Sequence, residues 1–427
     1  MSTIYALSTV AGKSAVAIIR ITGPRSKSIL QTLSRSRFPI VDHQAQLRSL
    51  KHPRTNEMLD RALCFFAAGP RTFTGEDTCE LHLHGSRAVI NAVLEAIPDC
   101  GHETRHALPG EFSKRAFLNG KMDLTQAEGL ADLINAETDE QRKSAFRQAD
   151  GSLTRIYDAW RTDLLKMRTT LEAVIDFGED NEDVEDIVAS KVITQVEVLK
   201  LEIQRHLESS LKGELIRNGI RVTIFGPPNA GKSSLLNILA QKDASIVSYE
   251  AGTTRDIVES FMDIGGYPII MSDTAGLRSG AAVGHIEQEG IKRARRRIQD
   301  ADIRLCVISK NEPMNPALVA ELKPFIQEQS DQEKIIIFLN KSDLDQESQM
   351  SREDVSRSLG IDLDCIHEIS CIKPTGIARM KSALLGKLKV LTRTYDGGHD
   401  QVYVGTNPRH RAQLRECLSH LGLFLNE

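Results

Sequence analysis

The chain has 427 residues, 41% of them hydrophobic, and a formal net charge of -4 at pH 7. This length suggests two to four domains at about 100–200 residues each. The near-neutral charge excludes a global basic surface for nucleic acid, so any RNA contact needs a local patch. Seven scattered cysteines without a C-x-x-C pair indicate neither a disulfide framework nor a zinc site. No apolar run approaches ~18 residues and no signal peptide is evident, so we expect a cytoplasmic protein without membrane contact.

The elements expected along the chain change in character near residue 120. Residues 1–120 mix short alternating strands with helices, which predicts an α+β domain. In Leu153–Ile175 apolar residues recur every three or four positions, which predicts a long helix with one apolar side. The acidic run Glu179–Asp186 is expected to be a solvated connection, and a second helical stretch should run from about Val188 to Lys212.

A phosphate-binding loop is indicated by Gly226–Ser233, which reads G-P-P-N-A-G-K-S. It follows a strand-like run, Arg221–Phe225, and precedes a helix-like run, Ser234–Ala240. Backbone N–H groups of such a loop point at the phosphates, and the helix N-terminus adds a favourable dipole. We expect Lys232 to reach the β- and γ-phosphates and the Ser233 hydroxyl to hold Mg²⁺. The alternative is a turn rich in glycine and proline with a chance lysine.

Further elements follow in the order that a GTPase requires. Thr254, within G-T-T-R-D, is expected to complete the Mg²⁺ shell, and Asp273 opens a D-x-x-G element after an apolar run. The N-K-S-D element ends at Asp343, whose carboxylate can accept two hydrogen bonds from guanine N1 and N2, which adenine cannot supply. Ser370 is placed to support the base. The residues expected to bind GTP are Asn229, Ala230, Gly231, Lys232, Ser233, Ser234, Ser248, Tyr249, Glu250, Ala251, Gly252, Thr253, Thr254, Asp273, Thr274, Ala275, Gly276, Asn340, Lys341, Asp343, Ser370, Cys371 and Ile372.

Hydrolysis requires a group that orients the attacking water. Many small GTPases use a Gln just after D-x-x-G, but here that position is Leu277, which cannot do so. Asn229 in the phosphate loop can ligate a monovalent cation, which could replace an arginine finger in neutralising transition-state charge. The alternative reading of Asn229 is a turn residue that tightens the loop.

The chain resembles the MnmE (TrmE) family of tRNA-modifying GTPases from Ile4 to about Arg415. Its G domain shares G-P-P-N-A-G-K-S-S, A-G-T-T-R-D and D-T-A-G-L. Family-like blocks outside the G domain are Thr3–Thr9 with Ala15–Gly23, Phe73–Asp77 with Glu80 and His82–Gly85, and Pro109–Leu124 with Gln126–Glu128.

The resemblance implies a function and partners. Family members act with the flavin-containing protein MnmG, which carries the FAD, in an expected heterotetramer. Together they add an aminomethyl or carboxymethylaminomethyl group to C5 of the wobble uridine of certain tRNAs. GTP hydrolysis is stimulated by K⁺, and the chain is expected to form a homodimer through its N-terminal and G domains. A basic run, Lys292–Arg297, could contact tRNA, although a charged helix face is the alternative.

The resemblance also assigns roles to single residues. Asn229, Ser248, Glu250 and Thr253 are expected to surround K⁺, and Ser233 and Thr254 to hold Mg²⁺. The expected catalytic residues are Glu287, Lys232 and Thr254, with Glu287 orienting the attacking water through a bridging water. An exposed carboxylate at a helix start is the alternative for Glu287.

The N-terminal domain resembles the family's tetrahydrofolate-binding module. Arg20, Glu80 and Lys121 align with positions that hold the folate derivative. A carboxylate can pair with the amino edge of the pterin, and the two cations can meet carboxylate or formyl oxygens. The alternatives are structural: Arg20 capping a strand, Glu80 in a surface ion pair, and Lys121 at a helix start.

The chain departs from the family pattern in three places. His84–Ser86 replaces H-G-G, and Ser370–Ile372 keeps only the serine of S-A-[KR]. The chain stops at Gly422–Glu427 without the family's C-[ILV]-G-K tail, and Cys417 does not match the tail cysteine. We therefore expect a shortened helical domain with the face carrying Trp160 partly uncovered, and tRNA modification that is impaired while GTP hydrolysis survives.

The expected fold is multidomain α/β, with a helical domain split by an inserted P-loop GTPase domain of Ras-like type. The domains are expected at 1–120 (folate-binding-like), 121–217 (helical, first part), 218–375 (GTPase) and 376–427 (helical, second part). Two other functions remain open. One is a GTP-dependent RNA-binding or assembly switch without modification chemistry, against which the block Pro109–Leu124 argues. The other is a one-carbon folate-binding protein regulated by GTP.

Overall fold

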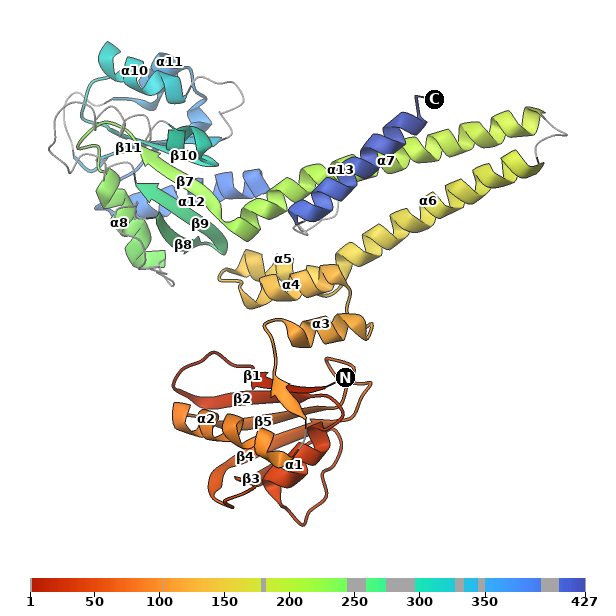
Figure 1. Cartoon of the computed structure of the whole chain (residues 1–427). Coiled ribbons are helices and arrows are strands. Elements are labelled where there is room, and N and C mark those ends of the chain that lie inside the picture. The colour runs from red at the N-terminus through yellow and green to blue at the C-terminus, as the bar shows by residue number, and fades with distance from the viewer. Residues whose placement is uncertain are drawn as a thin grey trace, which may run out of the picture. The chain divides into compact units, whose positions relative to one another are not determined.

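The computed structural model of the chain describes residues 2–101, 103–177, 182–243, 259–273, 296–326, 334–344, 350–392 and 407–426. The chain divides into two compact units, Met1–Ala127 and Glu128–Glu427. Helix α4 (Leu124–Ile134) contains the division between them. In Figure 1 the helices and strands are labelled and coloured by residue number, from red at the N-terminus to blue at the C-terminus.

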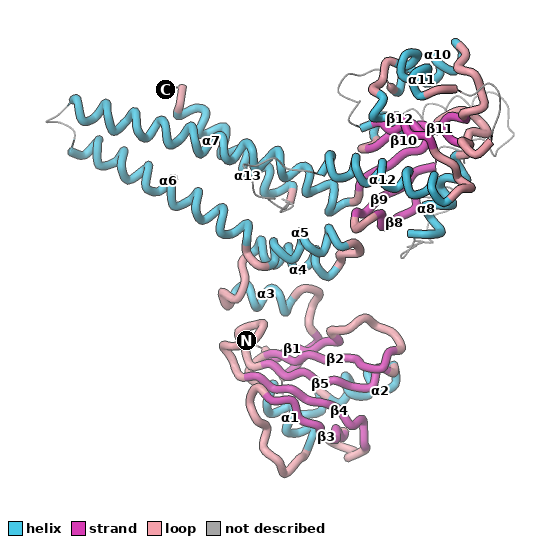
Figure 2. The backbone as a smooth tube through the Cα atoms, turned by 180° about the vertical axis from the view of Figure 1, so that it is seen from behind, coloured by secondary structure: helices cyan, strands magenta, loops and turns pink. Residues whose placement is uncertain are grey.

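The first unit is built on a six-stranded sheet in the order β3-β4-β5-β2-β1-β6. Neighbouring strands are antiparallel except β1 and β6, which are parallel. Helices α1 and α2 lie against the same face of this sheet (Figures 1 and 2). The elements are β1 (Thr3–Leu7), β2 (Ser14–Thr22), α1 (Ser26–Ser34), β3 (Gln44–Lys51), β4 (Met58–Ala67), β5 (Thr78–Gly85), α2 (Arg87–Ala96), η1 (Pro98–Cys100), β6 (Thr104–His106) and α3 (Glu111–Leu118).

The core of the first unit lies between the sheet and the two helices. Ile19, Ile21 and Leu81 alternate along their strands with more exposed residues and are fully buried. Leu30 and Leu33 of α1 pack into the same cluster. Because side chains alternate between the two faces of a strand, Arg20 and Glu80 point away from this core. The sheet therefore presents one covered apolar face and one face that carries polar groups.

The helical part of the second unit contains α5 (Asp139–Ala149), α6 (Ser152–Phe177), α7 (Glu182–Asn218) and α13 (Pro408–Phe424). Met167 of α6, Val192 and Val196 of α7 and Leu421 of α13 share one buried cluster. Trp160 is partly buried against that cluster. The face that carries Trp160 is thus covered in part by α7 and α13.

The second sheet has the strand order β12-β11-β10-β7-β9-β8. Every neighbouring pair is parallel except β8 and β9. Parallel strands need crossover connections, and such sheets bury both faces, which explains the near-continuous apolar strands. The elements are β7 (Ile220–Phe225), α8 (Lys232–Asp243), β8 (Glu259–Ile264), β9 (Tyr267–Asp273), β10 (Ile303–Ser309), α10 (Pro316–Leu322), η4 (Lys323–Phe325), β11 (Ile335–Asn340), α11 (Arg352–Leu359), η6 (Leu363–Cys365), β12 (Ile366–Glu368) and α12 (Pro374–Thr392).

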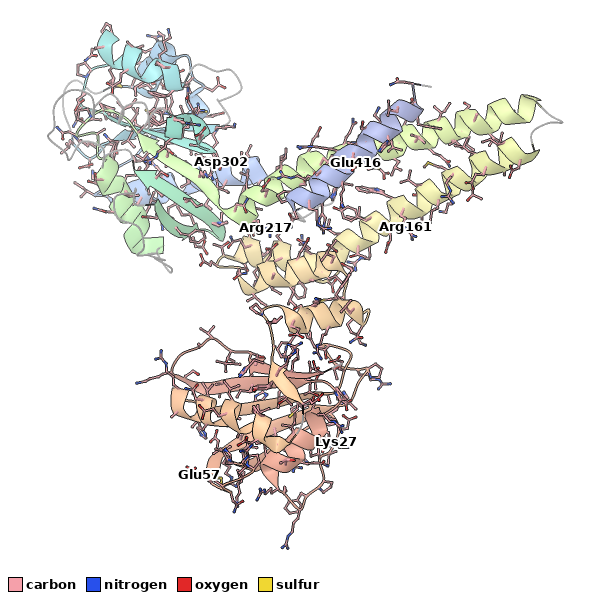
Figure 3. The ribbon with its side chains drawn as sticks, viewed as in Figure 1. Lys27, Glu57, Arg161, Arg217, Asp302 and Glu416 are labelled. Atoms are coloured by element: carbon pink, nitrogen blue, oxygen red, sulfur yellow. The ribbon has the colours of Figure 1, made fainter. Side chains whose placement is uncertain are left out.

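Polar contacts fix the point where α7 passes into β7. Arg217, labelled in Figure 3, lies close to the end of α7 and pairs with Asp132 of α4 at 2.9 Å. Asp302, just before β10, accepts a hydrogen bond from the Arg221 backbone N–H at 2.8 Å. Burial raises the pKa of Asp302 above its usual value. The start of the central strand is therefore anchored from both sides.

The β8–β9 hairpin turns at Gly265 and Gly266, which have φ of 62° and 90°. The Gly266 N–H donates to Asp263 Oδ1 at 2.7 Å, and the Gly266 carbonyl accepts from the Glu140 N–H at 3.0 Å. Glu140 is the second residue of α5, whose N-cap Thr138 forms a capping box with Gln141. The hairpin tip thus contacts the first turn of a helix outside the sheet.

The expected fold class is confirmed: an α+β unit is followed by helices interrupted by an α/β sheet. The long helix expected at Leu153–Ile175 is α6. The second helix is longer than expected, since α7 starts at Glu182 within the acidic run and continues to Asn218. The expected boundary between residues 375 and 376 falls inside α12, whose Met380, Leu384 and Leu388 pack in the core of the second sheet. No helix in the described ranges is long and apolar enough to cross a membrane.

Candidate nucleotide site and a polar cluster in the first unit

The phosphate-loop motif connects β7 to α8, as its flanking runs predict. Gly226 has φ of 139°, and a Cβ there would clash with the backbone carbonyl of Val307. Gly231 has φ of 99°, and a Cβ there would clash with the Asn340 side chain. Both glycines are therefore required by backbone conformation and by close neighbours. Leu235 and Leu239 of α8 are fully buried and hold the helix against the sheet.

Lys232 is the first residue of α8, and its ammonium group lies over the loop that precedes it. Its Nζ donates to the carbonyl oxygens of Gly226 at 2.9 Å and Pro227 at 2.7 Å. Ser233 and Ser234 are exposed in the first turn of α8. Backbone N–H groups at a helix start and a lysine ammonium are the donors that bind phosphate oxygens. The loop can therefore bind an anion at the carboxyl end of the central strand.

The N-K-S-D element lies beside this loop. Asn340, at the end of β11, is 2% exposed and donates through Nδ2 to the Ala230 carbonyl oxygen at 2.9 Å. Lys341 follows with φ of 66°. One side chain thus connects the N-K-S-D element to the phosphate loop. Parallel strands place their carboxyl ends at one edge of a sheet, which is where open α/β sheets bind ligands.

Asp343 and Ser370 come together although they are 27 residues apart. The Ser370 Oγ donates to Asp343 Oδ1 at 2.6 Å. The same Oγ accepts from the backbone N–H groups of Ile372 and Lys373 at 3.1 and 3.0 Å. The hydrogen bond from Ser370 lowers the pKa of Asp343 below its usual value. Asp343 is therefore held ionised and oriented, as a carboxylate must be to accept hydrogen bonds from a base. Cys371 is partly buried next to this contact.

Of the other residues expected to bind nucleotide, the structure describes some and not others. The backbone of Asp273 ends β9, in register with Ile224 of β7. Asn229 has φ of 59°, a left-handed conformation that asparagine tolerates well and that a turn residue needs. The cation-binding role of Asn229 remains a prediction. Eleven expected residues lie outside the described residues: Ser248, Tyr249, Glu250, Ala251, Gly252, Thr253, Thr254, Thr274, Ala275, Gly276 and Glu287.

The donor set fits Mg²⁺ in type, because a serine hydroxyl and phosphate oxygens are hard oxygen ligands. The described residues contain no group of three or more His, Cys, Asp or Glu side chains that could hold a metal ion. Of the two expected Mg²⁺ ligands, Ser233 lies within the described residues, exposed in the first turn of α8, and Thr254 lies outside them.

A second polar cluster occupies the first unit. Arg20 and Glu80 face each other on β2 and β5, with Arg20 Nη2 2.9 Å from Glu80 Oε1. The guanidinium carbon of Arg20 lies 5.3 Å from the ring centre of Phe73 and 5.7 Å from that of Phe112. His82 Nε2 lies 3.5 Å from Glu80 Oε2. Both ionic side chains are about one-quarter exposed, which allows a ligand to reach them and also suits an ordinary cross-strand ion pair.

Lys121 follows α3 and is exposed. Its side chain lies beside Gly75, where a Cβ would meet Lys121 Cε at 3.3 Å. Arg20 and Glu80 are thus in contact, while Lys121 lies against the loop that carries Phe73. Neither the two aromatic rings nor the buried Arg115 is predicted from the sequence to take part in the site. Their only sequence signal is that all three lie inside the motif blocks that resemble the family.

Comparisons with known proteins cover the whole chain. A family model described as "GTP-binding protein TrmE N-terminus" matches residues 3–121, and one described as "MnmE helical domain" matches residues 124–427. The tRNA modification GTPase MnmE of Parvibaculum lavamentivorans is 42% identical over 421 residues, covering 99% of this chain and 88% of that protein. The mitochondrial 5-taurinomethyluridine tRNA synthase subunit GTPB3 of Rattus norvegicus is 41% identical over 429 residues, covering 99% and 84%.

Among solved structures, the G domain of the FeoB iron transporter of T. maritima is 23% identical, with a TM-score of 0.28. The match covers 39% of this chain and 98% of that one.

Proposed function

Because the chain belongs to the MnmE (TrmE) family of tRNA modification GTPases, we propose that it hydrolyses GTP to support modification of tRNA. The modification is addition of an aminomethyl or carboxymethylaminomethyl group to C5 of the wobble uridine of certain tRNAs. The carbon comes from a tetrahydrofolate derivative, and the flavin is carried by an MnmG-type partner.

The contact between Ser370 and Asp343 is the observation that carries the GTP-binding part of the proposal. It keeps a carboxylate ionised at the edge of the sheet to which the phosphate loop belongs. An ionised carboxylate can accept two hydrogen bonds from guanine N1 and N2. Asn340 connects that edge to the phosphate loop through Ala230. One nucleotide can therefore be held by its base and its phosphates together.

Catalysis is proposed to depend on groups that stabilise charge on the phosphates and orient water. Lys232 binds the β- and γ-phosphate oxygens, and Glu287 orients the attacking water. Ser233 and Thr254 are the proposed Mg²⁺ ligands. Bound there, Mg²⁺ and K⁺ supply positive charge against the phosphate oxygens. The proposed K⁺ ligands are Asn229, Ser248, Glu250 and Thr253.

The cluster of Arg20 and Glu80 is proposed to bind the folate derivative with Lys121. Glu80 would accept hydrogen bonds from the amino edge of the pterin, and the two cations would pair with carboxylate or formyl oxygens. The Arg20–Glu80 contact and the two phenylalanine rings beside it support this role, since flat rings favour stacking of a heterocycle.

The proposed assembly follows the family. The chain would form a homodimer through its N-terminal and G domains and a heterotetramer with the flavoprotein, in the cytoplasm and without membrane contact. We propose that tRNA binds this assembly through local basic patches, because the chain as a whole is weakly acidic.

The decisive experiment compares the GTP hydrolysis rate of the full chain in K⁺ and in Na⁺. Glu287→Ala is measured alongside Glu289→Ala, a matched control two residues away. We expect a rate at least about tenfold faster in K⁺, which corresponds to about 1.4 kcal/mol of activation free energy. Glu287→Ala should abolish this rate and Glu289→Ala should retain it.

Equal slow rates in both salts, unchanged by Glu287→Ala, would contradict the cation-assisted mechanism. They would favour a GTP-dependent binding switch instead. Modification itself is tested by mass spectrometry of wobble nucleosides after incubation with tRNA, the MnmG-type flavoprotein and a reduced folate.

A further inference from the structure

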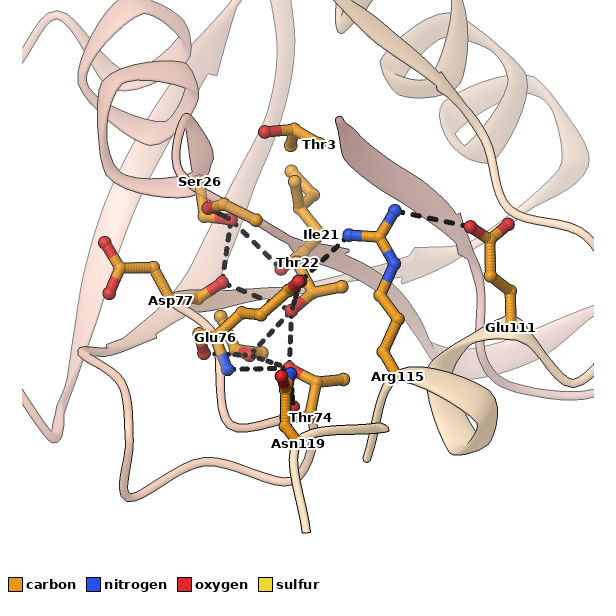
Figure 4. Close-up of polar contacts among 12 residues, drawn as sticks. Thr3, Ile21, Thr22, Ser26, Thr74, Glu76, Asp77, Glu111, Arg115 and Asn119 are labelled. Carbon is orange, nitrogen blue, oxygen red and sulfur yellow. Dashed lines mark hydrogen bonds and ion pairs between the residues drawn. The ribbon is translucent and has the colours of Figure 1, made fainter. Parts of the chain in front are cut away.

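A buried polar network connects α3 to the loop between β4 and β5 (Figure 4). Arg115 of α3 has Nη1 2.9 Å from Glu76 Oε2 in that loop, and Nη2 3.3 Å from Glu111 Oε1. The exposed fractions of these side chains are 6%, 14% and 11%. The guanidinium therefore bridges two carboxylates that belong to different elements and are largely shielded from water.

A second contact connects the same loop and helix. Asn119, just after α3, donates through Nδ2 to the Thr74 carbonyl oxygen at 2.7 Å. The loop is also attached to β2, because the hydroxyls of Thr22 and Thr74 lie 2.6 Å apart. Thr22 Oγ1 donates to Glu76 Oε2 at 3.4 Å (Figure 4). These contacts fix the loop against the strand that carries Arg20, two residues before Thr22.

The network lies next in sequence to both rings that approach Arg20. Phe73 immediately precedes Thr74 in the loop, and Phe112 immediately follows Glu111 in the first turn of α3. Neither ring comes from a strand of the sheet, so strand pairing does not place it. The positions of both rings beside the Arg20 guanidinium depend on how the loop and the helix start are held.

The choice of charged residues points to a role in geometry. Assembling charges away from water is costly, and well-packed apolar side chains often stabilise a fold equally well. A guanidinium bound to two carboxylates instead restricts how the helix and the loop can be oriented, because its N–H groups form a rigid planar fork. Hydrogen bonds from Arg105 lower the pKa of Glu111 to about 2, so this partner of Arg115 remains ionised.

We propose that Arg115 and Asn119 are positioning residues that hold Phe73 and Phe112 against Arg20 and thereby shape the site for the ring of a reduced folate. Arg115 acts through the two phenylalanines and does not touch the ligand. This inference rests on the proposed folate binding by Arg20 and Glu80.

The test is a double-mutant cycle on the affinity of the full chain for 5-formyltetrahydrofolate, measured by titration calorimetry. The variants are Arg115→Met, the pair Phe73→Ala with Phe112→Ala, and all three changes together. Lys114→Met, an exposed neighbour on α3, is the matched control. We expect Arg115→Met to weaken binding about tenfold, with no further loss once both rings are removed, because residues that act through one another are not additive. Arg115→Lys, which keeps the charge, should recover part of the affinity.

Fully additive losses in the cycle would overturn the inference, since Arg115 would then act independently of the rings. A ligand-free measurement separates this failure from failure of folate binding. Amide hydrogen exchange in residues 72–77 should accelerate in Arg115→Met while β2 and β5 stay protected. Faster exchange throughout the unit would make Arg115 a general stability residue and overturn its positioning role. If the unmodified chain binds no folate, the proposed folate function fails, while the exchange pattern still decides whether Arg115 positions the loop.

Discussion

Ser370 donates a 2.6 Å hydrogen bond to the carboxylate of Asp343, and this contact lowers the pKa of that carboxylate. A carboxylate with a depressed pKa contributes to binding above its ordinary pKa, and the contribution is lost as pH falls through the lowered value. Ser370→Ala should therefore move the acid loss of GTP affinity to higher pH. At neutral pH we expect nucleotide to dissociate about five- to tenfold faster, at about 1 kcal/mol for a lost hydrogen bond.

Dissociation of a fluorescent GDP analogue as a function of pH checks this prediction. Ser342→Ala is a nearby control, because no side-chain hydrogen bond joins Ser342 to Asp343. Identical pH profiles for Ser370→Ala and the unmodified chain would show that the serine does not tune the carboxylate.

Asp343→Asn should change which base is accepted. The amide can no longer accept hydrogen bonds from both guanine N1 and N2, and its NH₂ group would face the N2 donor. Xanthine carries a carbonyl at that position, which the amide NH₂ can donate to. We expect GTP affinity to fall at least about 100-fold, at about 1.4 kcal/mol per tenfold, and affinity for xanthosine triphosphate to rise. Competition between the two nucleotides measures the switch, and an unchanged preference for GTP would remove Asp343 from base recognition.

Gly226→Ala should damage both stability and nucleotide binding. The residue has φ of 139°, and the added methyl group would meet the Val307 carbonyl. The expected cost is about 1–3 kcal/mol in the free energy of unfolding, with weaker GTP binding because the loop must shift. Gly360→Ala is the matched control, since Gly360 has φ of 71° with open space around it. The control should lose about 1 kcal/mol of stability and no nucleotide affinity. Equal effects of the two changes on GTP binding would contradict this explanation.

His206 makes the helical part of the second unit sensitive to acid. Burial, followed by the charge of His410, lowers the pKa of His206 to about 4 from its ordinary 6.5. Its Nε2 lies 3.4 Å from the Tyr157 hydroxyl. The unfolded chain binds this proton first, so stability is complete above about pH 6.5 and falls as pH decreases toward about 4. The loss reaches about 3 kcal/mol at most.

Melting temperature measured from pH 7 to pH 4 tests this dependence. His206→Gln keeps a polar side chain that does not titrate, so its acid loss should be smaller in this window. His420→Gln serves as the control, since His420 is an exposed histidine of α13. Parallel pH curves for His206→Gln and the unmodified chain would rule out the proposed role of His206.

The nucleotide motifs could be predicted from sequence because the residues of each motif are adjacent in the chain. Gly226–Ser233 and Asn340–Asp343 each specify a loop at a strand end, and the strands and helices around them form where expected. The contacts between motifs could not be read in this way. Arg115 is 39 residues from Glu76 in sequence, and no hydrophobic pattern or local motif predicts that the two side chains pair. The roles of the site residues and the domain boundaries remain predictions.

The extent of two helices was also beyond the sequence pattern. The acidic run was expected to be a connection, yet α7 begins inside it, at Glu182. The apolar spacing of α12 predicts a helix with a buried face but does not indicate which element covers that face. Only the folded chain shows that Met380 and Leu384 pack on the sheet.

The backbone amide of Glu140, which donates to the Gly266 carbonyl, can be followed by NMR as a measure of the position of the β8–β9 hairpin. The first N–H groups of a helix have no partner within the helix, so this amide depends on the hairpin for protection. The hairpin strands lead to Asp273 at one end and to residue 259, next to the expected Thr254 loop, at the other. The exchange rate and chemical shift of this one amide proton in α5 therefore show whether the hairpin stays in contact with α5 while nucleotide is bound and hydrolysed.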